Sequence, residues 1–161
     1  MSAAQPKAEL KPCDPDWDAK VRASFARQTF MHTIGAHIAS LSPGRCEVEL
    51  PFRHDLCQQH GYLHGGVITA IAANAAGYAA FSLMPANSSV LGVEYKINLL
   101  GIGEGERFFA CGSVLKPGRT LSVVRAEVEA LRGGVRHPVA RMLATMMCME
   151  GRPEPGLEVR A

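Results

Sequence analysis

The sequence predicts an α+β fold in which an antiparallel sheet packs on one long, buried helix. Three observations predict it. The stretch from Gly65 to Leu83 is rich in alanine, which favours helix, and is apolar on almost every helical face. Four long strand-like segments follow this stretch and are separated by turns that contain glycine or proline. One short helix and two strands precede it, an order typical of an α+β domain.

The first predicted element is an amphipathic helix over residues 16–30, in which Trp17, Val21 and Phe25 fall at helical spacing. An aspartate at its start, Asp16 or Asp18, could cap it. Two strands follow, over residues 36–41 and 45–50, joined by a Ser-Pro-Gly turn signal. Residues 51–63 are predicted to be irregular.

The later strands are predicted over residues 89–100, 107–116, 120–131 and 136–149. The glycine-rich segment 101–105, Pro117-Gly118 and Gly133-Gly134 separate them, which indicates hairpins and hence a meander. Segment 101–105 resembles a phosphate loop only superficially, because a dinucleotide fingerprint must lead from a strand into a helix. A helix that is apolar all round cannot be covered by one face of a sheet, so a second subunit is expected on its other side.

The composition suits a single domain and excludes several classes of protein. We expect one domain over residues 16–149 of the 161, flanked by flexible tails over residues 1–15 and 150–161 that are rich in proline. A net charge of +2, no run of four Lys or Arg and 6% aromatic residues argue against nucleic-acid binding. The apolar stretch carries Thr69 and Asn74 and is therefore read as a core helix, not a membrane span.

The five cysteines are scattered, contain no C-x-x-C and follow no secretory signal, so a cytoplasmic location with free thiols is expected. Cys57, His60 and His64 have a spacing that metal ligands could use. There is no second cysteine pair and no H-E-x-x-H motif. The sequence therefore favours a polar active-site or surface loop, and we expect neither a metal nor another cofactor.

The most informative residues are His64, Gly65 and Gly66, which open the buried helix. Two glycines at a helix start stabilise it poorly, but they leave the first backbone N–H groups open to a ligand. These groups lie at the positive end of the helix dipole and could hold the oxyanion that forms when a carbonyl is attacked. The alternative is that the glycines serve close packing or a tight turn.

The segment Gln58 to Val67, with the alanine-rich helix behind it, resembles the hotdog-fold acyl-CoA thioesterases and, more narrowly, their phenylacetate-degradation-type (PaaI-like) branch. The similarity runs from about Phe25 to Met149 and includes Gly77-Tyr78-Ala79-Ala80, Glu94-Tyr95-Lys96-Ile97-Asn98, Gly105-Glu106 and Pro117-Gly118-Arg119-Thr120. It implies a long helix inside a curved antiparallel sheet. It also implies a homodimer joined edge to edge by its sheets, and a dimer of dimers.

The resemblance also implies roles for single residues. The Gly65 N–H would polarise the thioester carbonyl, Gln58 would lie near the attacking water or the carbonyl, and His64 would orient the turn by hydrogen bonding. The 118–120 turn would meet the phosphates of coenzyme A, for which the Arg119 guanidinium is chemically suited. An exposed hairpin arginine without this role is the alternative. The residues that the resemblance assigns to substrate binding are Gly66, Asn74, Lys96, Asn98, Gly118, Arg119 and Thr120.

One position departs from the family pattern. The catalytic Asp or Glu of the family lies nine residues after the histidine, and here that position is Ala73, followed by Asn74. Alanine cannot activate water, and the Asn74 amide is not a base. Three explanations stay open: a deliberate acid-to-alanine change, a natural protein that only binds an acyl-CoA, or catalysis in which Gln58, His60 or a partner residue positions the water.

The sequence thus supports two hypotheses. The first is an acyl-CoA, or aryl-CoA, thioesterase that releases the acid and free coenzyme A. The second is an acyl-CoA-binding or regulatory dimer without turnover. Residues 65 and 73 are eight apart on one helix, about 12 Å along its axis, so the first hypothesis expects a site shared between two antiparallel helices. The small residues Ala72, Ala73, Ala75, Ala76, Gly77, Ala79 and Ala80 would allow that approach, unless they pack beneath the subunit's own sheet.

Overall fold

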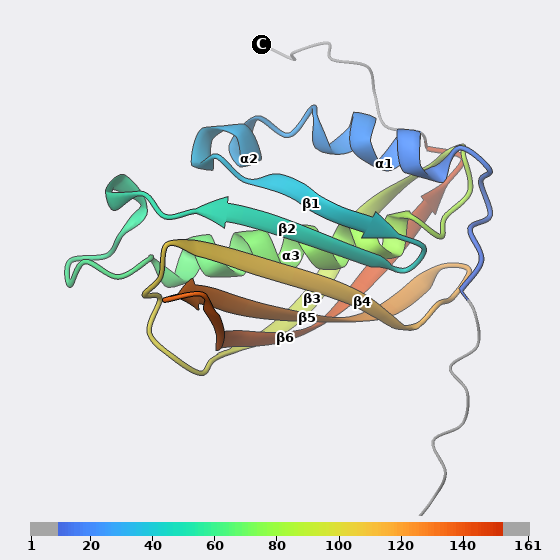
Figure 1. Ribbon diagram of the computed structural model, residues 1–161. Helices are drawn as coiled ribbons and strands as arrows, with labels where there is room; N and C mark the ends of the chain where they lie inside the picture. The colour runs from blue at the N-terminus through green and yellow to red at the C-terminus, as the bar shows by residue number, and fades with distance from the viewer. Residues whose placement is uncertain (1–9, 153–161) are drawn as a thin grey trace, which may run out of the picture.

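The structure is a computed structural model that describes residues 10–152 (Figure 1). Two short helices, α1 (Trp17–Phe25) and α2 (Thr29–Ile34), precede strands β1 (His37–Ser42) and β2 (Arg45–Pro51). A single 3-10 turn, η1 (His54–Leu56), leads to the long helix α3 (Gly65–Phe81). The remaining strands are β3 (Ser88–Leu99), β4 (Arg107–Lys116), β5 (Leu121–Arg132) and β6 (Val135–Glu150). Each predicted strand and the long helix are therefore present, with ends that differ by at most two residues.

The six strands form one antiparallel sheet in the order β1-β2-β4-β5-β6-β3. Strands β4, β5 and β6 are a meander, as predicted. Strand β3 pairs with β6 and lies at the edge, so segment 101–105 is not the predicted hairpin turn. It crosses from one edge of the sheet past β6 and β5 to β4, where Gly103 accepts a hydrogen bond from the Leu63 N–H with its carbonyl oxygen. Strand length alone could not distinguish this crossover from a hairpin.

Helix α3 lies along one face of the sheet, which curves around it (Figure 1). The contact is closest at Gly112 of β4, where a Cβ atom would overlap the Ala75 carbonyl. The alanines at 72, 75, 76, 79 and 80 are buried against this sheet, with at most 1% of their surface exposed. Most of the small residues thus serve packing within the subunit. On the face of α3 that points away from the sheet, four small residues stay accessible to solvent. They are Ala73 and Gly77 of the predicted run, together with Gly66 and Ala70.

The predicted helix over residues 16–30 is two helices, because the chain takes an extended conformation at Gln28. The break turns Phe30 to the surface, where 54% of it is exposed. Helix α1 packs on the C-terminal half of α3, with the Phe25 and Tyr78 rings 5.5 Å apart. Helix α3 is therefore covered by the sheet on one side and in part by α1 on another. A second subunit is needed only for the part of the outer face that α1 leaves uncovered.

Residues 10–15, which the sequence assigned to a flexible tail, pack on the domain. The Cys13 N–H donates to the Leu83 carbonyl oxygen, and Asp14 is buried with 4% of its surface exposed. The Asp14 carboxylate accepts the Asp16 N–H at 2.9 Å, so Asp14 rather than Asp16 or Asp18 satisfies the start of α1. Of the predicted C-terminal tail, Glu150 belongs to β6 and the Gly151 N–H donates to the Asn87 carbonyl oxygen. Residues 1–9 and 153–161 lie outside the described residues.

Asp14 also pairs with Lys20 at 3.1 Å, and Lys20 donates to the carbonyl oxygens of Met84 and Pro85 just after α3. Burial acts to raise the pKa of Asp14, but the bonds from the Asp16 N–H and Lys20 outweigh it and hold the pKa below 3.8. A depressed pKa in the folded state stabilises the protein above pH 3.8, and this contribution is lost as the pH falls.

We expect Asp14→Asn to lower the free energy of unfolding at pH 7 by about 1–2 kcal/mol, since it leaves Lys20 without its carboxylate. Urea unfolding of both proteins at several pH values measures this, and the difference should narrow as the pH falls below 3.8. Asp18→Asn is the control, because Asp18 makes only an exposed ion pair with Arg22. An equal effect of both substitutions at pH 7 would contradict the expectation.

Candidate active site

The start of α3 presents a backbone donor without an acceptor. His64 is the N-cap residue, in an extended conformation, and its Nδ1 accepts the Gly66 N–H at 2.9 Å. The Val67 and Ile68 N–H groups donate to the His64 carbonyl oxygen. Among the described residues, none accepts a hydrogen bond from the Gly65 N–H. The imidazole thus orders the turn, and the Gly65 N–H is open at the positive end of the helix dipole.

The loop before α3 holds Gln58 in a tight turn. The Gly61 N–H donates to the Gln58 carbonyl oxygen, and the Gln58 N–H donates to the Tyr62 carbonyl oxygen. The side-chain Oε1 accepts the His60 N–H, which leaves the amide Nε2 as the group available to donate. The His64 N–H donates to the Leu56 carbonyl oxygen and ties this loop to the helix start. Gln58, His64 and Gly65, three of the predicted catalytic residues, are therefore brought together.

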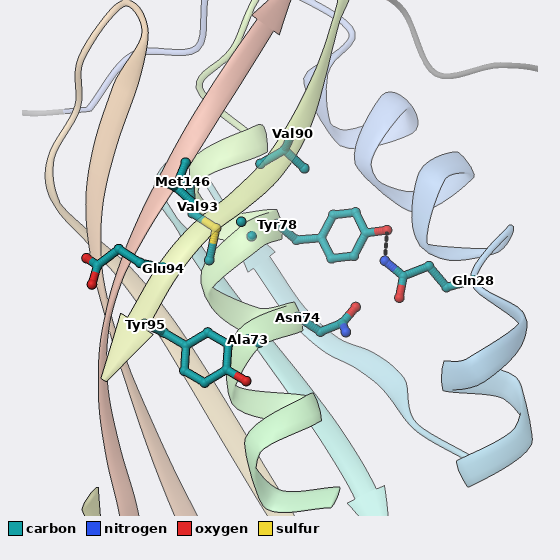
Figure 2. A pocket seen from close by; sticks show the side chains of 11 residues that line it. Gln28, Ala73, Asn74, Tyr78, Val90, Val93, Glu94, Tyr95 and Met146 are labelled. Carbon is teal, nitrogen blue, oxygen red and sulfur yellow. Dashed lines mark hydrogen bonds between the residues drawn. The ribbon is translucent and has the colours of Figure 1, made fainter. Parts of the chain in front are cut away.

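Ala73, the fourth predicted catalytic residue, lies two turns beyond Gly65 on α3. It lines a cavity of about 290 Å³ (Figure 2). The cavity is bounded by α3, strand β3, Met146 of β6 and Gln28 from the break between α1 and α2. Gly77 adds space, since a Cβ atom there would meet nothing within 4 Å. Asn74 lines the cavity as well, so two residues singled out from the sequence share one pocket.

Glu94 is the one carboxylate that lines this cavity, and its side chain points away from Ala73 on the other side of β3 (Figure 2). The Thr145 hydroxyl donates to it at 2.8 Å on that outer face. Lys96 and Asn98 follow at alternate positions of β3 and bond to each other, the Lys96 Nζ donating to the Asn98 Oδ1 at 2.7 Å. Within one subunit these two predicted binding residues are therefore separated from Gly65 and Ala73 by the sheet.

The turn between β4 and β5 carries the predicted residues Gly118, Arg119 and Thr120, and all three are exposed. Gly118 and Arg119 border a second cavity of about 490 Å³ at the C-terminal end of α3. Lys11 lines the same cavity. No sequence motif marks this lysine, because residues 1–15 have the composition of a tail. The cavity thus offers two cationic side chains to an anionic group.

One residue of the cavity beside Ala73, Gln28, had no signal in the sequence. Gln28 reaches α3 only because the first helix breaks, and its Nε2 donates to the Tyr78 hydroxyl at 2.8 Å. Tyr78 also exchanges a hydrogen bond with Ser24 of α1. These contacts join the N-terminal segment to the wall of the cavity beside Ala73.

Within residues 10–152, no three His, Cys, Asp or Glu side chains gather as a metal site would require. The candidate set of Cys57, His60 and His64 is not brought together: His64 Nδ1 is used by Gly66, and Cys57 Sγ is directed to the Arg53 carbonyl oxygen. None of the helices in this part of the chain combines the length and hydrophobicity of a membrane span.

One long helix inside a curved antiparallel sheet, with an open N–H at the helix start, defines the class of hotdog-fold thioesterases. The Thioesterase superfamily model matches residues 60–136. A putative esterase of Saccharolobus solfataricus is 33% identical over 100 residues, which are 62% of this chain and 71% of that protein. The 1,4-dihydroxy-2-naphthoyl-CoA hydrolase of Listeria monocytogenes is 31% identical over 91 residues, 56% of this chain and 74% of that protein.

Solved structures of related proteins have the same fold as this chain. A thioesterase family protein from Silicibacter pomeroyi is 49% identical, with a TM-score of 0.83 over 84% of this chain and 99% of that one. The E. coli PaaI protein from the phenylacetic acid degradation operon has the same fold, with a TM-score of 0.75 and 19% identity over 86% of this chain and 97% of that one. The chain belongs to the Thioesterase superfamily. The predicted hotdog fold and the predicted thioesterase family are confirmed.

Proposed function

We propose that the protein is an acyl-CoA thioesterase scaffold that binds a coenzyme A thioester and directs water to its carbonyl. The observation that carries this proposal is the open Gly65 N–H at the start of α3. A single N–H at a helix start, aimed at a carbonyl oxygen, stabilises the oxyanion of the tetrahedral intermediate. Collapse of that intermediate breaks the C–S bond and releases the acid and free coenzyme A.

The remaining groups are assigned by chemistry. Gln58 Nε2 donates to the carbonyl or to the attacking water, and His64 is a positioning residue that acts through the turn. Lys11 and Arg119 attract the phosphates of coenzyme A, for which a guanidinium is a strong partner. The Listeria relative, named for a CoA thioester, supports this substrate class.

We further propose that each site is shared by two subunits. Gly65 and Ala73 are about 12 Å apart along one helix axis, and reacting groups must lie about 3 Å from the same carbonyl. Arg119 lies at the far end of the same helix. A partner subunit with its helix antiparallel to α3 would place its own Gly65 beside this chain's Ala73, along the partly open strip that contains Gly66 and Ala70.

The partner would join through β3, one of the two edge strands of the sheet. Leu91, Val93, Tyr95 and Leu99 of this strand are each more than half exposed. An apolar edge strand without a neighbour readily pairs with a second chain. A homodimer joined at this edge, and a dimer of dimers built from it, are therefore our proposals for the assembly.

Ala73 limits the chemistry, because it supplies no base and Glu94 is turned away from it. A carboxylate at position 73 would take the proton of the attacking water as the C–O bond forms. We therefore expect this chain to bind CoA thioesters and to release thiol slowly or not at all. Ala73→Asp should restore turnover.

The test is a panel of CoA esters, with binding followed by calorimetry and thiol release by absorbance, for this chain and for Ala73→Asp. Release only after the substitution supports a thioesterase scaffold that lacks its acid. Binding by both forms without hydrolysis by either favours the alternative, a binding or regulatory dimer. If neither form binds any CoA ester, both functions are excluded. Ala73→Asn is the matched control, because it fills the same space without adding a base.

A further inference from the structure

Two cysteines line the cavity of about 490 Å³ at the C-terminal end of α3. Cys13 comes from the N-terminal segment and is exposed, whereas Cys148 comes from β6 and has 7% of its surface exposed. Both thiols are free. The thioesterase chemistry proposed above uses no thiol of the protein, so these two side chains are a feature of the cavity that it does not explain.

The accessible thiol is held in place beside the cavity. The Cys13 N–H donates to the Leu83 carbonyl oxygen at 3.3 Å, and the next residue, Asp14, is buried and pairs with Lys20 at 3.1 Å. The N-terminal segment passes along the end of the sheet that carries the turn between β4 and β5 (Figure 1). A reagent from solvent can therefore reach the Cys13 sulfur, whereas the Cys148 sulfur is closed off in the cavity wall.

The same cavity offers positive charge and a spare hydrogen-bond donor. Lys11 precedes Cys13 by two residues, and Arg119 comes from the turn between β4 and β5. Ser122 also lines the cavity with 5% of its surface exposed, and its Oγ accepts the Gly118 N–H at 3.3 Å. Among residues 10–152, none accepts the Ser122 hydroxyl proton, and none of those that line the cavity is acidic. An anionic group would thus meet two positive charges, a buried donor and no negative charge.

We propose that Cys13 is a modification site at which a small anionic thiol is attached by thiol–disulfide exchange. The Cys13 thiolate attacks one sulfur of a disulfide of that thiol. A new S–S bond to Cys13 forms as the S–S bond of the reagent breaks, and the other half leaves as a thiolate that takes up the proton released by Cys13. Cys13 is oxidised and the leaving half is reduced, so the reagent disulfide is the oxidant. Lys11 and Arg119 hold the carboxylates or phosphates of the attached thiol.

Glutathione and coenzyme A share this chemistry, the first through carboxylates and the second through phosphates. The modification does not depend on the proposed function, but its consequence does. Because the proposed function places the phosphates of coenzyme A between Lys11 and Arg119, an adduct on Cys13 occupies the same cavity and competes with a CoA thioester. A reductant removes the adduct and restores binding.

The test measures how fast the full chain forms adducts with four disulfides at low ionic strength. Oxidised glutathione and coenzyme A disulfide are anionic, hydroxyethyl disulfide is neutral and cystamine is cationic. Each rate is divided by the rate with a neutral cysteine amide in solution, which removes the intrinsic reactivity of the reagent. We expect mass spectrometry to find the adduct on Cys13, formed about tenfold faster with at least one anionic disulfide than with the neutral one. The difference should disappear in about 1 M salt.

The two anionic reagents show which source of the thiol the cavity prefers. Equal normalised rates for the anionic and neutral disulfides would overturn the proposal without touching the proposed function. A first adduct on another cysteine would overturn it as well. Cys13→Ser is the control, and it should form no adduct at the rate measured for the unchanged chain.

A double variant, Lys11→Gln with Arg119→Gln, keeps the approximate size of both side chains and removes their charge. It should slow the anionic disulfides about fivefold or more and leave the rate with the neutral disulfide unchanged. The neutral reagent reports whether Cys13 is still accessible in the same way, so a misplaced N-terminal segment is recognised. An unchanged preference for the anionic disulfides in this variant would overturn the role of the two cations.

The consequence is measured by calorimetry with a thioether analogue of a CoA ester, before and after glutathione is attached to Cys13. The dissociation constant should rise about tenfold with the adduct and return when a reductant is added. An adduct that leaves the dissociation constant unchanged would contradict the placement of the coenzyme A phosphates in this cavity, whereas the modification site would stand. No binding of the analogue before modification would count against the proposed function alone.

Discussion

When two inactive forms of the protein are refolded together, about one site of two in each mixed dimer is expected to regain hydrolysis. One form is this chain, with Gly65 and Ala73; the other carries Ala73→Asp together with Gly65→Pro. In a mixed dimer, one site combines the Gly65 N–H of the first form with the aspartate of the second. The other site has neither group. General-base and oxyanion groups each contribute on the order of 10² in rate, so the gain over either homodimer is about that large.

Gly65→Pro removes the N–H with little risk to the fold. Position 65 is the first residue of α3, where proline is favoured, and His64 already has the extended conformation that a residue before proline prefers (φ −62°, ψ 135°). A new Cβ atom would lie 3.1 Å from the flexible end of Leu99. Gly65→Ala adds the same atom but keeps the N–H, and so is the matched control. Mixed dimers that form but stay inactive, beside active Ala73→Asp homodimers, would refute the shared site.

Most of the fold could be predicted from local sequence patterns. The wrong prediction, a hairpin at segment 101–105, shows what such patterns do not contain. The alanine-rich run and the glycine-containing turns gave α3 and all six strands to within one or two residues. The local pattern predicts a hairpin at segment 101–105, because a short glycine-rich connection usually joins neighbouring strands. The pairing of β3 with β6 depends on contacts far apart in the chain, which no local pattern contains. The break at Gln28 likewise depends on packing against α3.

The candidate site divides in the same way. Gln58, His64 and Gly65 form one local turn, so their motif predicts both their identity and their proximity. Lys96 and Asn98 were chosen from a motif, and strand parity puts them on the outer face. Gln28 and Lys11 were missed because they reach the cavities only through tertiary packing of a segment that carries no motif. A site built from distant segments requires the structure.

The closest approach of α3 to the sheet should make Gly112 irreplaceable. A Cβ atom at Gly112 would overlap the Ala75 carbonyl and crowd the Ala76 nitrogen, both backbone atoms of a buried helix that cannot rotate away. We expect Gly112→Ala to lower the free energy of unfolding by about 3 kcal/mol or more, since overpacking against backbone forces a shift of the helix. Urea unfolding at equilibrium measures the change.

Gly92→Ala is the control, because it is also a strand glycine, and a Cβ atom there would make one ordinary contact, 3.9 Å from the Met146 sulfur. It should change stability by less than about 1 kcal/mol. Because Ala75 and Ala76 lie between positions 73 and 77, a displaced helix also moves the cavity. In the Ala73→Asp background, the folded fraction of Gly112→Ala should therefore lose activity. A Gly112→Ala protein as stable as Gly92→Ala would contradict the close packing of α3 against β4. It would also contradict the conclusion that this packing fixes the position of residue 73.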